Sequence, residues 1–322
     1  MELTINNDMN PKVTIATITY NSSRYVRQSI ESVLAQSFTD FEYLISDDCS
    51  TDGTWDIVKE YKDPRIRAWR NETNLREYPN RNKTLFEAKG EYIIWIDGDD
   101  IFYPHGLEYM VKMLDAFPTS VMACARPHWD NMIYPYELSP KEAFRYEFLG
   151  SPILVNGFPD TLIRTRELQA INGFPTDIIS GDTHSKRLLA CKSNVVLVNQ
   201  QVSWWRRTPG QASSRLHALG GVLNTYNSSL SILENDDCPL DASEILKAKE
   251  FLRIGMANYL IKNQFTHGRL ISVFKVSKLL KLKLSDFYKA IKKREFFYIT
   301  GSGTDPLMLD FSKNPYAPNY EH

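Results

Sequence analysis

The stretch Tyr92-Ile93-Ile94-Trp95-Ile96-Asp97-Gly98-Asp99-Asp100 decides how the rest of the chain is interpreted. Its first five residues are apolar, a pattern typical of a strand that is buried on both faces inside a parallel sheet. Three carboxylates follow within four residues and repel one another, so they need a compensating charge such as a hard divalent cation. A solvated acidic turn that bends at Gly98 is the alternative interpretation.

The composition indicates a folded protein with ample core in one large or two linked domains. The chain has 322 residues, of which 43% are hydrophobic and 12% aromatic. A net charge of -1 gives no support for nucleic-acid binding. The four cysteines are scattered without a CxxC pair, which disfavours a zinc site or a disulfide framework. Neither a signal peptide nor an apolar run of about 20 residues is found, so we expect a cytoplasmic protein.

Four strands with helices between them are predicted in the first hundred residues. The expected strands are Val13–Tyr20, Phe41–Ser46, Ile66–Trp69 and the run that begins at Tyr92. This βαβαβαβ order predicts a parallel sheet covered by helices. The second strand also ends in acids, Asp47 and Asp48, so two strands should deliver carboxylates to one edge, where such sheets bind ligands. No glycine-rich phosphate loop follows the first strand, which argues against a nucleotide-dependent oxidoreductase or a P-loop NTPase.

Local signals predict where these helices begin and end. Residues 21–23 read as a capping cluster for the first helix, and Thr51 or Asp52 as the cap of the second. Gly90 is expected in the left-handed position after the third helix.

The regular alternation of predicted strands and helices ends after Pro104. A helix is expected at Leu107–Phe117, and strands at Val121–Cys124, Thr161–Arg164 and Val195–Val198. Aromatic residues and prolines between Trp129 and Pro159 suggest a recognition surface. Helical spacing dominates afterwards, in Leu216–Leu233, Ala242–Lys262 and Leu270–Lys283, with Asp241 as a cap.

The last of these helical segments is strongly basic. Between Lys262 and Glu295 there are ten lysines or arginines and only two acids. A basic amphipathic segment can lie on anionic lipid, which predicts peripheral contact with the inner membrane face. An ordinary solvated helix face, or a contact between copies in a homo-oligomer, is an equally supported alternative.

Four motifs resemble, in order and spacing, the donor-binding half of the inverting glycosyltransferases of family 2, which have the GT-A fold. They are Thr19-Tyr20-Asn21, the segment 47–54, Arg81-Asn82 and the segment 97–100. Downstream, Asn172-Gly173-Phe174, Gly181-Asp182 and the segment 205–210 are similar to the acceptor-side motifs of that family.

The resemblance implies an α/β fold with a Rossmann-like, mostly parallel sheet and flanking helices. The chain would divide into a flexible N-terminus (1–12), a donor half (13–103), an acceptor half (104–215), a helical C-terminal region (216–300) and a tail (301–322). The resemblance does not reach the helical C-terminal region.

The resemblance also implies a donor site. Thr19 and Tyr20 would pack on the nucleobase, and Asp48 would accept a hydrogen bond from the uracil imide while Asp47 holds the turn. The remaining donor contacts would come from Arg81, Asp97, Asp99, Arg206 and Arg207. Asp99 and Asp100 would bind Mn²⁺ or Mg²⁺, which neutralises charge on the leaving diphosphate.

Asp182 stands at the position of the family's catalytic base, which takes the proton of the acceptor hydroxyl. The alternative role for Asp182 is a cap for the helix that follows, and Arg81 could be a surface partner of Glu77. Trp204 and Trp205 would either lie in the core or stack on the acceptor sugar. His184, two residues after Asp182, would point elsewhere and is interpreted as a surface residue.

These observations predict a metal-dependent inverting glycosyltransferase of cell-surface polysaccharide or glycoconjugate synthesis. It would move a sugar from a UDP-sugar donor to the hydroxyl of a saccharide or lipid-linked saccharide. Two alternatives stay open: a nucleotidyltransferase, and a sugar-nucleotide or glycan-binding module without turnover. Gly181 and Thr208 prompt the second, because the family often has an acid and a histidine at these positions.

Overall fold

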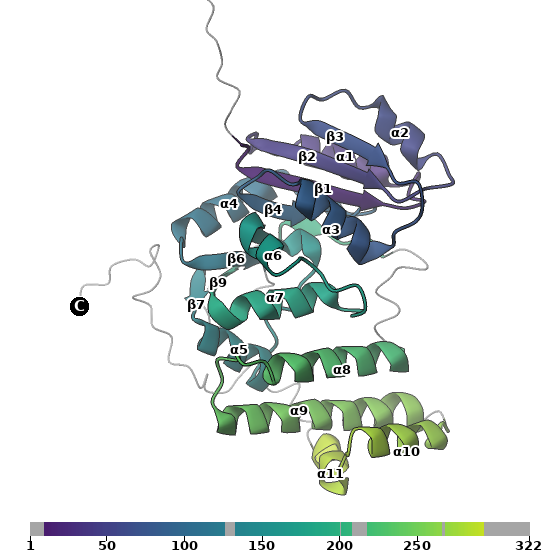
Figure 1. Cartoon of the computed structure of the whole chain (residues 1–322), viewed down its shortest axis with the longest axis vertical. Coiled ribbons are helices and arrows are strands. Elements are labelled where there is room, and N and C mark those ends of the chain that lie inside the picture. Colours follow the sequence, from purple (N-terminus) through teal and green to yellow (C-terminus); the bar gives the residue numbers. More distant parts are fainter. Residues whose placement is uncertain (1–9, 126–132, 200, 208–217, 266–267, 293–322) are drawn as a thin grey trace, which may run out of the picture.

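The computed structural model describes residues 10–125, 133–199, 201–207, 218–265 and 268–292. Its centre is an eight-stranded mixed sheet of order β3-β2-β1-β4-β8-β6-β9-β7 (Figure 1). The strands are β1 (Val13–Thr19), β2 (Phe41–Asp47), β3 (Ile66–Arg70), β4 (Tyr92–Trp95), β6 (Ser120–Ala125), β7 (Tyr136–Leu138), β8 (Thr161–Arg164) and β9 (Asn194–Val198). A separate two-stranded ribbon pairs β5 (Ile101–Phe102) with β10 (Ser203–Trp204).

The first four strands confirm the predicted parallel arrangement. β1 pairs with β2 on one side and with β4 on the other, and β3 extends the sheet beyond β2. Thr19 at the end of β1 lies opposite Asp47 at the end of β2. Because these strands run in one direction, the ends of β1, β2 and β4 meet at one edge of the sheet.

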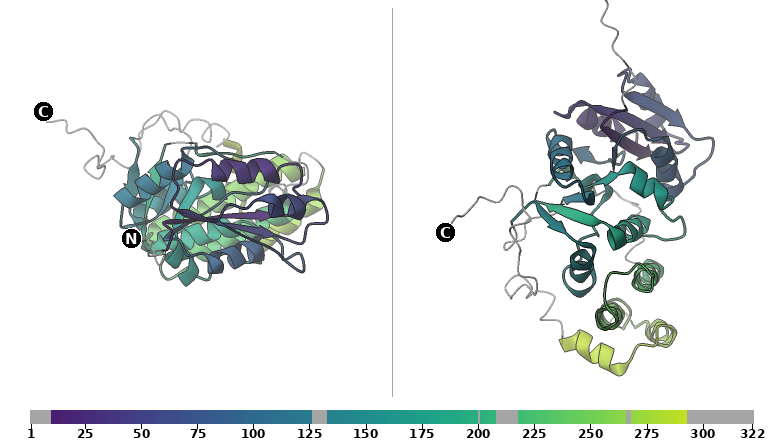
Figure 2. Two further views of the ribbon diagram at one scale, coloured as in Figure 1. Left: turned by 90° about the horizontal axis from the view of Figure 1, so that it is seen from above. Right: turned by 60° about the vertical axis from the view of Figure 1, so that its left-hand side comes forward.

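Helices cover both faces of the sheet (Figure 2). One face packs against α1 (Val26–Leu34), α2 (Thr54–Glu60) and α4 (Gly106–Ala116). The other face packs against α3 (Glu77–Glu87), α5 (Pro140–Leu149), α6 (Thr165–Ala170) and α7 (Gly181–Lys192). The alternation of strand side chains explains this division, since Ile94 contributes to the first core and its neighbours Ile93 and Trp95 to the second.

Several predicted helix ends are wrong in detail. The helix α1 begins after Tyr25, and the side chain of Asn21 instead accepts a hydrogen bond from the Thr51 backbone amide at 2.8 Å. The helix α3 ends at Glu87, and Gly90 does not have a left-handed φ. A glycine is needed there because a Cβ atom would lie 2.3 Å from the backbone nitrogen of Thr14.

Part of the segment between residues 129 and 159, where the sequence predicts a recognition surface, packs in the core. The helix α5 has a capping box, in which Ser139 and Glu142 bond each other's backbone amides, and Pro140 at its first position. Its side chains Phe144 and Phe148 lie in the core. These two aromatic side chains are therefore core residues. Trp129 lies outside the described residues, and the recognition surface stays a prediction.

The C-terminal region is helical, as predicted, and stacks beyond α7 at the end of the molecule farthest from β3 (Figure 1). It contains α8 (Leu219–Leu233), α9 (Ala242–Leu260), a π-helical turn (Ile261–Phe265), α10 (Leu270–Leu279) and α11 (Leu284–Lys292). Asp241 caps α9, as expected. The single helix predicted at 270–283 ends at Leu279, because Lys281 has a φ of 51° and starts a turn. Among the described helices, none combines the length and hydropathy needed to span a bilayer.

Candidate active site

Three acids cluster at the end of β4. The Asp97 carboxylate accepts a hydrogen bond from Nη2 of Arg81 at 2.6 Å, and Asp100 is buried with Oδ1 2.9 Å from the Arg206 backbone amide. Asp99 is partly exposed, and its carbonyl accepts from Nε of Arg206 at 2.8 Å. A solvated acidic turn is therefore not what the chain forms here.

Gly98 is required at this point by a close approach rather than by a bend. A Cβ atom on Gly98 would lie 2.7 Å from Oγ1 of Thr19. The backbone of the acidic segment therefore lies directly against the end of β1, which brings the two strand ends into one site.

The acids carry more negative charge than their surroundings offset. Burial, together with the neighbouring carboxylates of Asp97 and Asp99, raises the pKa of Asp100 to about 8. A carboxylate in such a place gains stability from a bound cation. This imbalance fits the divalent metal that the sequence predicts.

The number of ligands also fits a metal that is shared with a substrate. Within the described residues, no group of three or more His, Cys, Asp or Glu side chains could hold a metal ion alone. Mg²⁺ usually takes one or two carboxylates together with substrate phosphates, and all the acids here offer hard oxygen ligands. Asp99 and Asp100 could supply the protein ligands, with a diphosphate completing the shell.

The ends of β1 and β2 hold the other predicted donor residues. Thr19 is buried, and its Oγ1 has no hydrogen-bond partner in the part of the chain that the structure describes. Tyr20, the next residue, is exposed and available for contact with a ligand. The Asp47 carboxylate accepts from the amide of Ser50 at 3.1 Å and from its hydroxyl, so Asp47 holds the turn as predicted.

Asp48 is more constrained than the sequence suggests. Its Oδ1 accepts from the amide of Leu75 at 2.8 Å and from Nδ2 of Asn71 at 2.9 Å, and its Oδ2 accepts from the amide of Arg76 at 2.8 Å. A carboxylate has about four acceptor positions, so these three bonds fix its orientation. The uracil contact stays a prediction, and it would use the remaining position on Oδ2.

Arg81 is not the surface residue of the alternative interpretation. Its side chain is 2% exposed, lies 3.7 Å above the Phe158 ring and pairs with Asp97 as well as with Glu77 at 3.8 Å. Burial alone would lower the pKa of the guanidinium, but Asp97 and Glu77 raise it, so the group stays charged. Its Nε and Nη1 atoms have no hydrogen-bond partner within the described residues.

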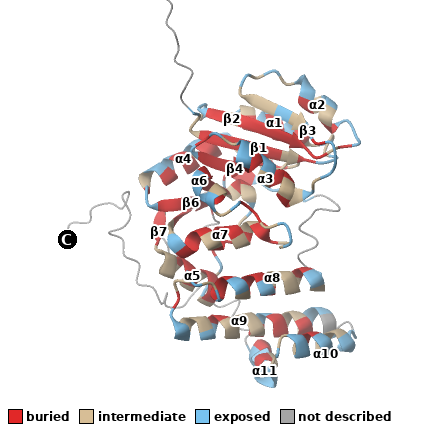
Figure 3. Ribbon diagram, in the orientation of Figure 1, coloured by how far each residue is buried: buried red, intermediate tan, exposed pale blue. Residues whose placement is uncertain are grey.

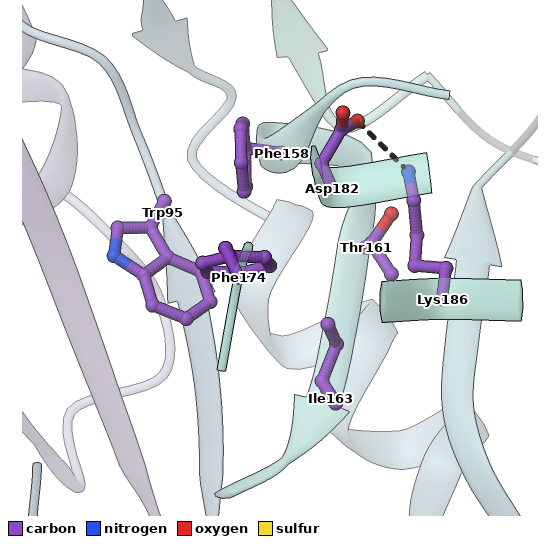
Figure 4. Close-up of a pocket in the computed structure, with 7 residues that line it drawn as sticks. All are labelled: Trp95, Phe158, Thr161, Ile163, Phe174, Asp182 and Lys186. Carbon is purple, nitrogen blue, oxygen red and sulfur yellow. Dashed lines mark ion pairs between the residues drawn. The ribbon is translucent and has the colours of Figure 1, made fainter. Parts of the chain in front are cut away.

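Asp182 lies in the first turn of α7 and lines a small cavity of about 10 Å³, and its carboxylate points toward the ammonium group of Lys186 (Figure 4). The side chain is 18% exposed, with Oδ2 3.4 Å from Nζ of Lys186 and Oδ1 3.4 Å from the Tyr78 hydroxyl. The residue before α7 is Ser180, and no side chain caps this helix end. The capping alternative for Asp182 is therefore wrong.

Two neighbours of Asp182 were not found from the sequence. Lys186 is buried and donates to the Asn156 carbonyl, while the Tyr78 hydroxyl donates to the Ile179 carbonyl at 2.9 Å and accepts from the Gly181 amide at 2.8 Å. Lys186 could have been found from the sequence, because an acid and a base four residues apart on a helix lie close enough to pair. Tyr78 had no such signal, because it reaches Asp182 across about a hundred residues.

Gly181 and His184 also have structural explanations. A Cβ atom on Gly181 would lie 2.9 Å from the Pro175 carbonyl and 3.0 Å from the Tyr78 ring, so no acid fits there. His184 points away from Asp182, as predicted, but it is half-buried against α8, with Nδ1 2.9 Å from the Ser228 hydroxyl. The interpretation as a surface residue is therefore wrong. Thr208 lies outside the described residues.

The residues around Trp204 form an open hollow of about 470 Å³. Trp204 and Trp205 are 43% and 49% exposed, so they do not belong to the core. The Arg206 guanidinium lies 4.6 Å from the Trp204 ring and 4.5 Å from the Tyr25 ring, which are favourable cation–π distances. The hollow is lined by Arg24, Tyr25, Trp204, Trp205, Arg206 and Arg207, and the first two were not predicted.

The fold and the site together define an α/β protein whose candidate ligand-binding site lies at the carboxyl edge of the parallel strands β1, β2 and β4. The family model described as glycosyl transferase family 2 matches residues 14–172. This region of the chain therefore belongs to glycosyl transferase family 2, as the motifs predict, and the fold is of the GT-A type.

Relatives and solved structures agree with this assignment. Over 103 residues the chain is 40% identical to the Escherichia coli UDP-Glc:alpha-D-GlcNAc-diphosphoundecaprenol beta-1,3-glucosyltransferase WfaP, an alignment that covers 32% of this chain and 41% of that protein. The structure of Staphylococcus aureus TarS with UDP-GlcNAc has a TM-score of 0.61 at 20% identity, over 87% of this chain and 79% of that one.

A third similarity is to a solved mannosyltransferase structure. The mannosyltransferase PcManGT of Pyrobaculum calidifontis, in complex with GDP-Man and Mn²⁺, has a TM-score of 0.62 at 16% identity, over 90% of this chain and 86% of that one. At such identities the two structures show a shared fold alone. The chain spans between 28% and 60% of the length of the curated relatives that it matches.

Proposed function

We propose that the chain is a metal-dependent inverting glycosyltransferase of cell-surface polysaccharide or glycoconjugate synthesis. It transfers a sugar from a UDP-linked donor to the hydroxyl of a saccharide or lipid-linked saccharide. We call Asp97, Asp99 and Asp100 at the end of β4 the acid edge. The observation that carries the proposal is that one helix, α3, reaches both ends of the site: its Arg81 bonds Asp97 at the acid edge, and its Tyr78 bonds Asp182. The name of WfaP, which includes UDP-Glc, and the structure of TarS in complex with UDP-GlcNAc support this donor class.

The two halves of the site are halves of one sheet. The donor half, residues 13–103, contributes β1 to β4, and the acceptor half, residues 104–215, continues the sheet where β8 pairs antiparallel with β4. In the helical region that follows, α8 packs against α7 and supports the helix that carries Asp182.

On the donor side, Tyr20 and Thr19 pack on the base, while Asp48 and Asp97 orient the nucleoside. Nε and Nη1 of Arg81 are buried and have no hydrogen-bond partner within the described residues, so a donor whose ribose or diphosphate oxygen atoms reach them supplies the missing acceptors. Asp99 and Asp100 hold Mn²⁺ or Mg²⁺. When bound, this ion offsets the charge that develops on the leaving diphosphate.

Arg206 contacts the acidic segment at the end of β4 and also lines the hollow around Trp204. Its backbone amide and guanidinium bond the acidic segment, and its Nη2 donates to Oε1 of Gln28 at 2.7 Å. With Arg207, it places positive charge beside the expected diphosphate. Trp204 and Trp205 expose their rings in the same hollow, where they offer flat apolar surfaces to a sugar.

On the acceptor side, Asp182 takes the proton from the attacking hydroxyl. The sugar then passes to that oxygen in one displacement, from the face opposite the diphosphate, and the anomeric configuration inverts. Lys186 and Tyr78 are positioning residues that hold the Asp182 carboxylate from its two oxygens.

The test is transfer by an Asp182→Asn variant, with UDP-glucose and UDP-N-acetylglucosamine as donors and a panel of saccharide acceptors. We expect turnover to fall by about 10²- to 10⁴-fold, the usual contribution of a general base. Binding of UDP with Mn²⁺ should be unchanged. Asp177→Asn, which alters an exposed acid on the loop before α7, is the matched control. Normal turnover in the Asp182 variant would remove the assignment of the base.

A further inference from the structure

We propose that α10 and α11 form a docking surface for a bilayer that contains anionic lipid. The proposal does not depend on the catalytic assignment, because it rests on residues at the opposite end of the chain. We define the basic end as the described residues of 262–292, which comprise the π-helical turn, α10 and α11.

The basic end exposes large apolar side chains that a folded core would normally cover. Phe274 is 75% exposed and Leu284 is 90% exposed. The same region appears largely exposed or intermediate in Figure 3, in contrast to the buried sheet. The exposed apolar residues are Phe265, Leu270, Ile271, Phe274, Leu279, Leu284, Tyr288 and Ile291. Such an exposed group of apolar side chains marks an interaction site.

The helix α10 has one face in a small core and an exposed face that combines apolar and basic side chains. Its buried residue Val276 packs on a small core formed by α8 and α9. Ile271, Phe274 and Lys278 follow at intervals of three and four residues and are all exposed, so they share the outward face. Lysine side chains with long apolar stems thus alternate with apolar side chains on one surface, as in helices that lie in a membrane interface.

The charge of the basic end is one-sided. Its described residues include eight lysines or arginines and one acid, Asp286. Asp286 is buried, accepts from the Lys283 amide at 2.8 Å and lies 3.5 Å from Nε of Arg253. No exposed residue of the basic end is therefore an acid, although Glu250 of the neighbouring α9 pairs with Lys289. The remaining positive charge is complementary to anionic head groups.

The same charge argues against a second copy as the occupant. In a twofold interface each copy presents the same patch, so two basic ends would bring lysines of like sign together. Anionic lipid supplies the opposite sign and also accepts the apolar side chains. A lipid surface therefore satisfies both features of the basic end.

The experiment is co-sedimentation of the full chain with two kinds of vesicle. One is phosphatidylcholine alone, and the other contains phosphatidylglycerol in addition. We expect binding to the anionic vesicles that weakens strongly between about 0.1 M and about 1 M salt, because the screening length falls from about 10 Å to about 3 Å. Equal binding to both vesicles, or no binding, would overturn the proposal.

Two variants separate the charge from the apolar contribution. Lys275→Glu with Lys278→Glu should lower the partition coefficient at least about tenfold, since each basic residue near such a surface contributes noticeably to binding. The matched control is Lys62→Glu with Lys89→Glu, which changes net charge equally on exposed residues of the sheet region. An equal loss in this control would overturn the assignment to the basic end.

Ile271→Ser with Phe274→Ser should also reduce binding, and Phe86→Ser, an exposed phenylalanine on α3, is its control. Circular dichroism and the unfolding midpoint should match the wild type in every variant. Light scattering decides against lipid if the wild type is a dimer that these serine variants dissociate while vesicle binding is absent.

Discussion

Arg81 and Arg187 are both buried arginines that stack on a phenylalanine and pair with an acid, yet they differ in how completely they are bonded. Arg187 lies 4.9 Å above the Phe148 ring and bonds Glu147 through Nε and Nη2, and Ser229 through Nη1 at 2.9 Å. The second oxygen of Glu147 accepts from the amides of Ile153 and Leu154.

Arg81 has an incomplete version of the same arrangement. It uses only Nη2 toward Asp97, whose side chain is partly exposed, and two of its nitrogen atoms have no partner in the described chain. A buried charged group with unused donors is costly unless a ligand supplies the acceptors. The comparison predicts that Arg187 acts in stability and that Arg81 acts in ligand binding.

The largest expected effect is on the fully bonded pair of Arg187 and Glu147. Glu147→Gln leaves the Arg187 charge buried without its carboxylate, so we expect the free energy of unfolding to fall by about 3–5 kcal/mol. Urea unfolding followed by circular dichroism measures this loss. Glu60→Gln, which breaks an exposed pair with Arg27, should cost no more than about 1 kcal/mol. Similar small losses in both variants would break the comparison.

Arg81→Met should have a smaller effect on stability and a larger one on binding. Asp97 can be hydrated after the change, because its side chain is 31% exposed. A hydrogen bond to a charged group contributes about 1.5–3 kcal/mol, so UDP affinity should fall about 10- to 100-fold in calorimetry. Arg67→Met, a change at a more exposed arginine, is the control. Unchanged UDP affinity in Arg81→Met would place Arg81 with Arg187 as a structural residue.

The smallest effect concerns pH. Burial lowers the pKa of His184, and the nearby charge of Arg187 lowers it further. The unfolded chain therefore binds a proton at this site at a higher pH than the folded chain. Stability should be lost as the pH falls through about 6.5, the ordinary histidine value, toward the lowered folded value. His184→Gln should show a weaker loss in urea unfolding near pH 5.5, and an unaltered profile would contradict this assignment.

The acid edge could be predicted from the sequence because its residues are neighbours in the chain. Asp97 to Asp100 follow a strand, and the strand order brings them to the same edge of the sheet as Asp47 and Asp48, with β1 between the two segments. The helix α5 also had a local signal, since Ser139, Pro140 and Glu142 form a readable capping box.

The rest depends on contacts between distant segments. Tyr78 reaches Asp182, Arg187 reaches Glu147, and the Arg206 amide reaches Asp100, and each pair is separated by at least 40 residues. No local periodicity specifies such pairs, because packing of complete elements creates them. Gly90 shows the same limit, since its role comes from the approach of β1 rather than from the end of α3.

The most direct test of the acid edge is calorimetric binding of UDP, GDP and CDP, each with and without Mn²⁺, to the wild type and to Asp100→Ala. We predict that UDP binds selectively, that Mn²⁺ strengthens the binding, and that Asp100→Ala loses the effect of the metal. Binding that ignores Mn²⁺, or that favours GDP or CDP over UDP, would contradict the assignment of the acids at the end of β4 to a metal-bound UDP-sugar.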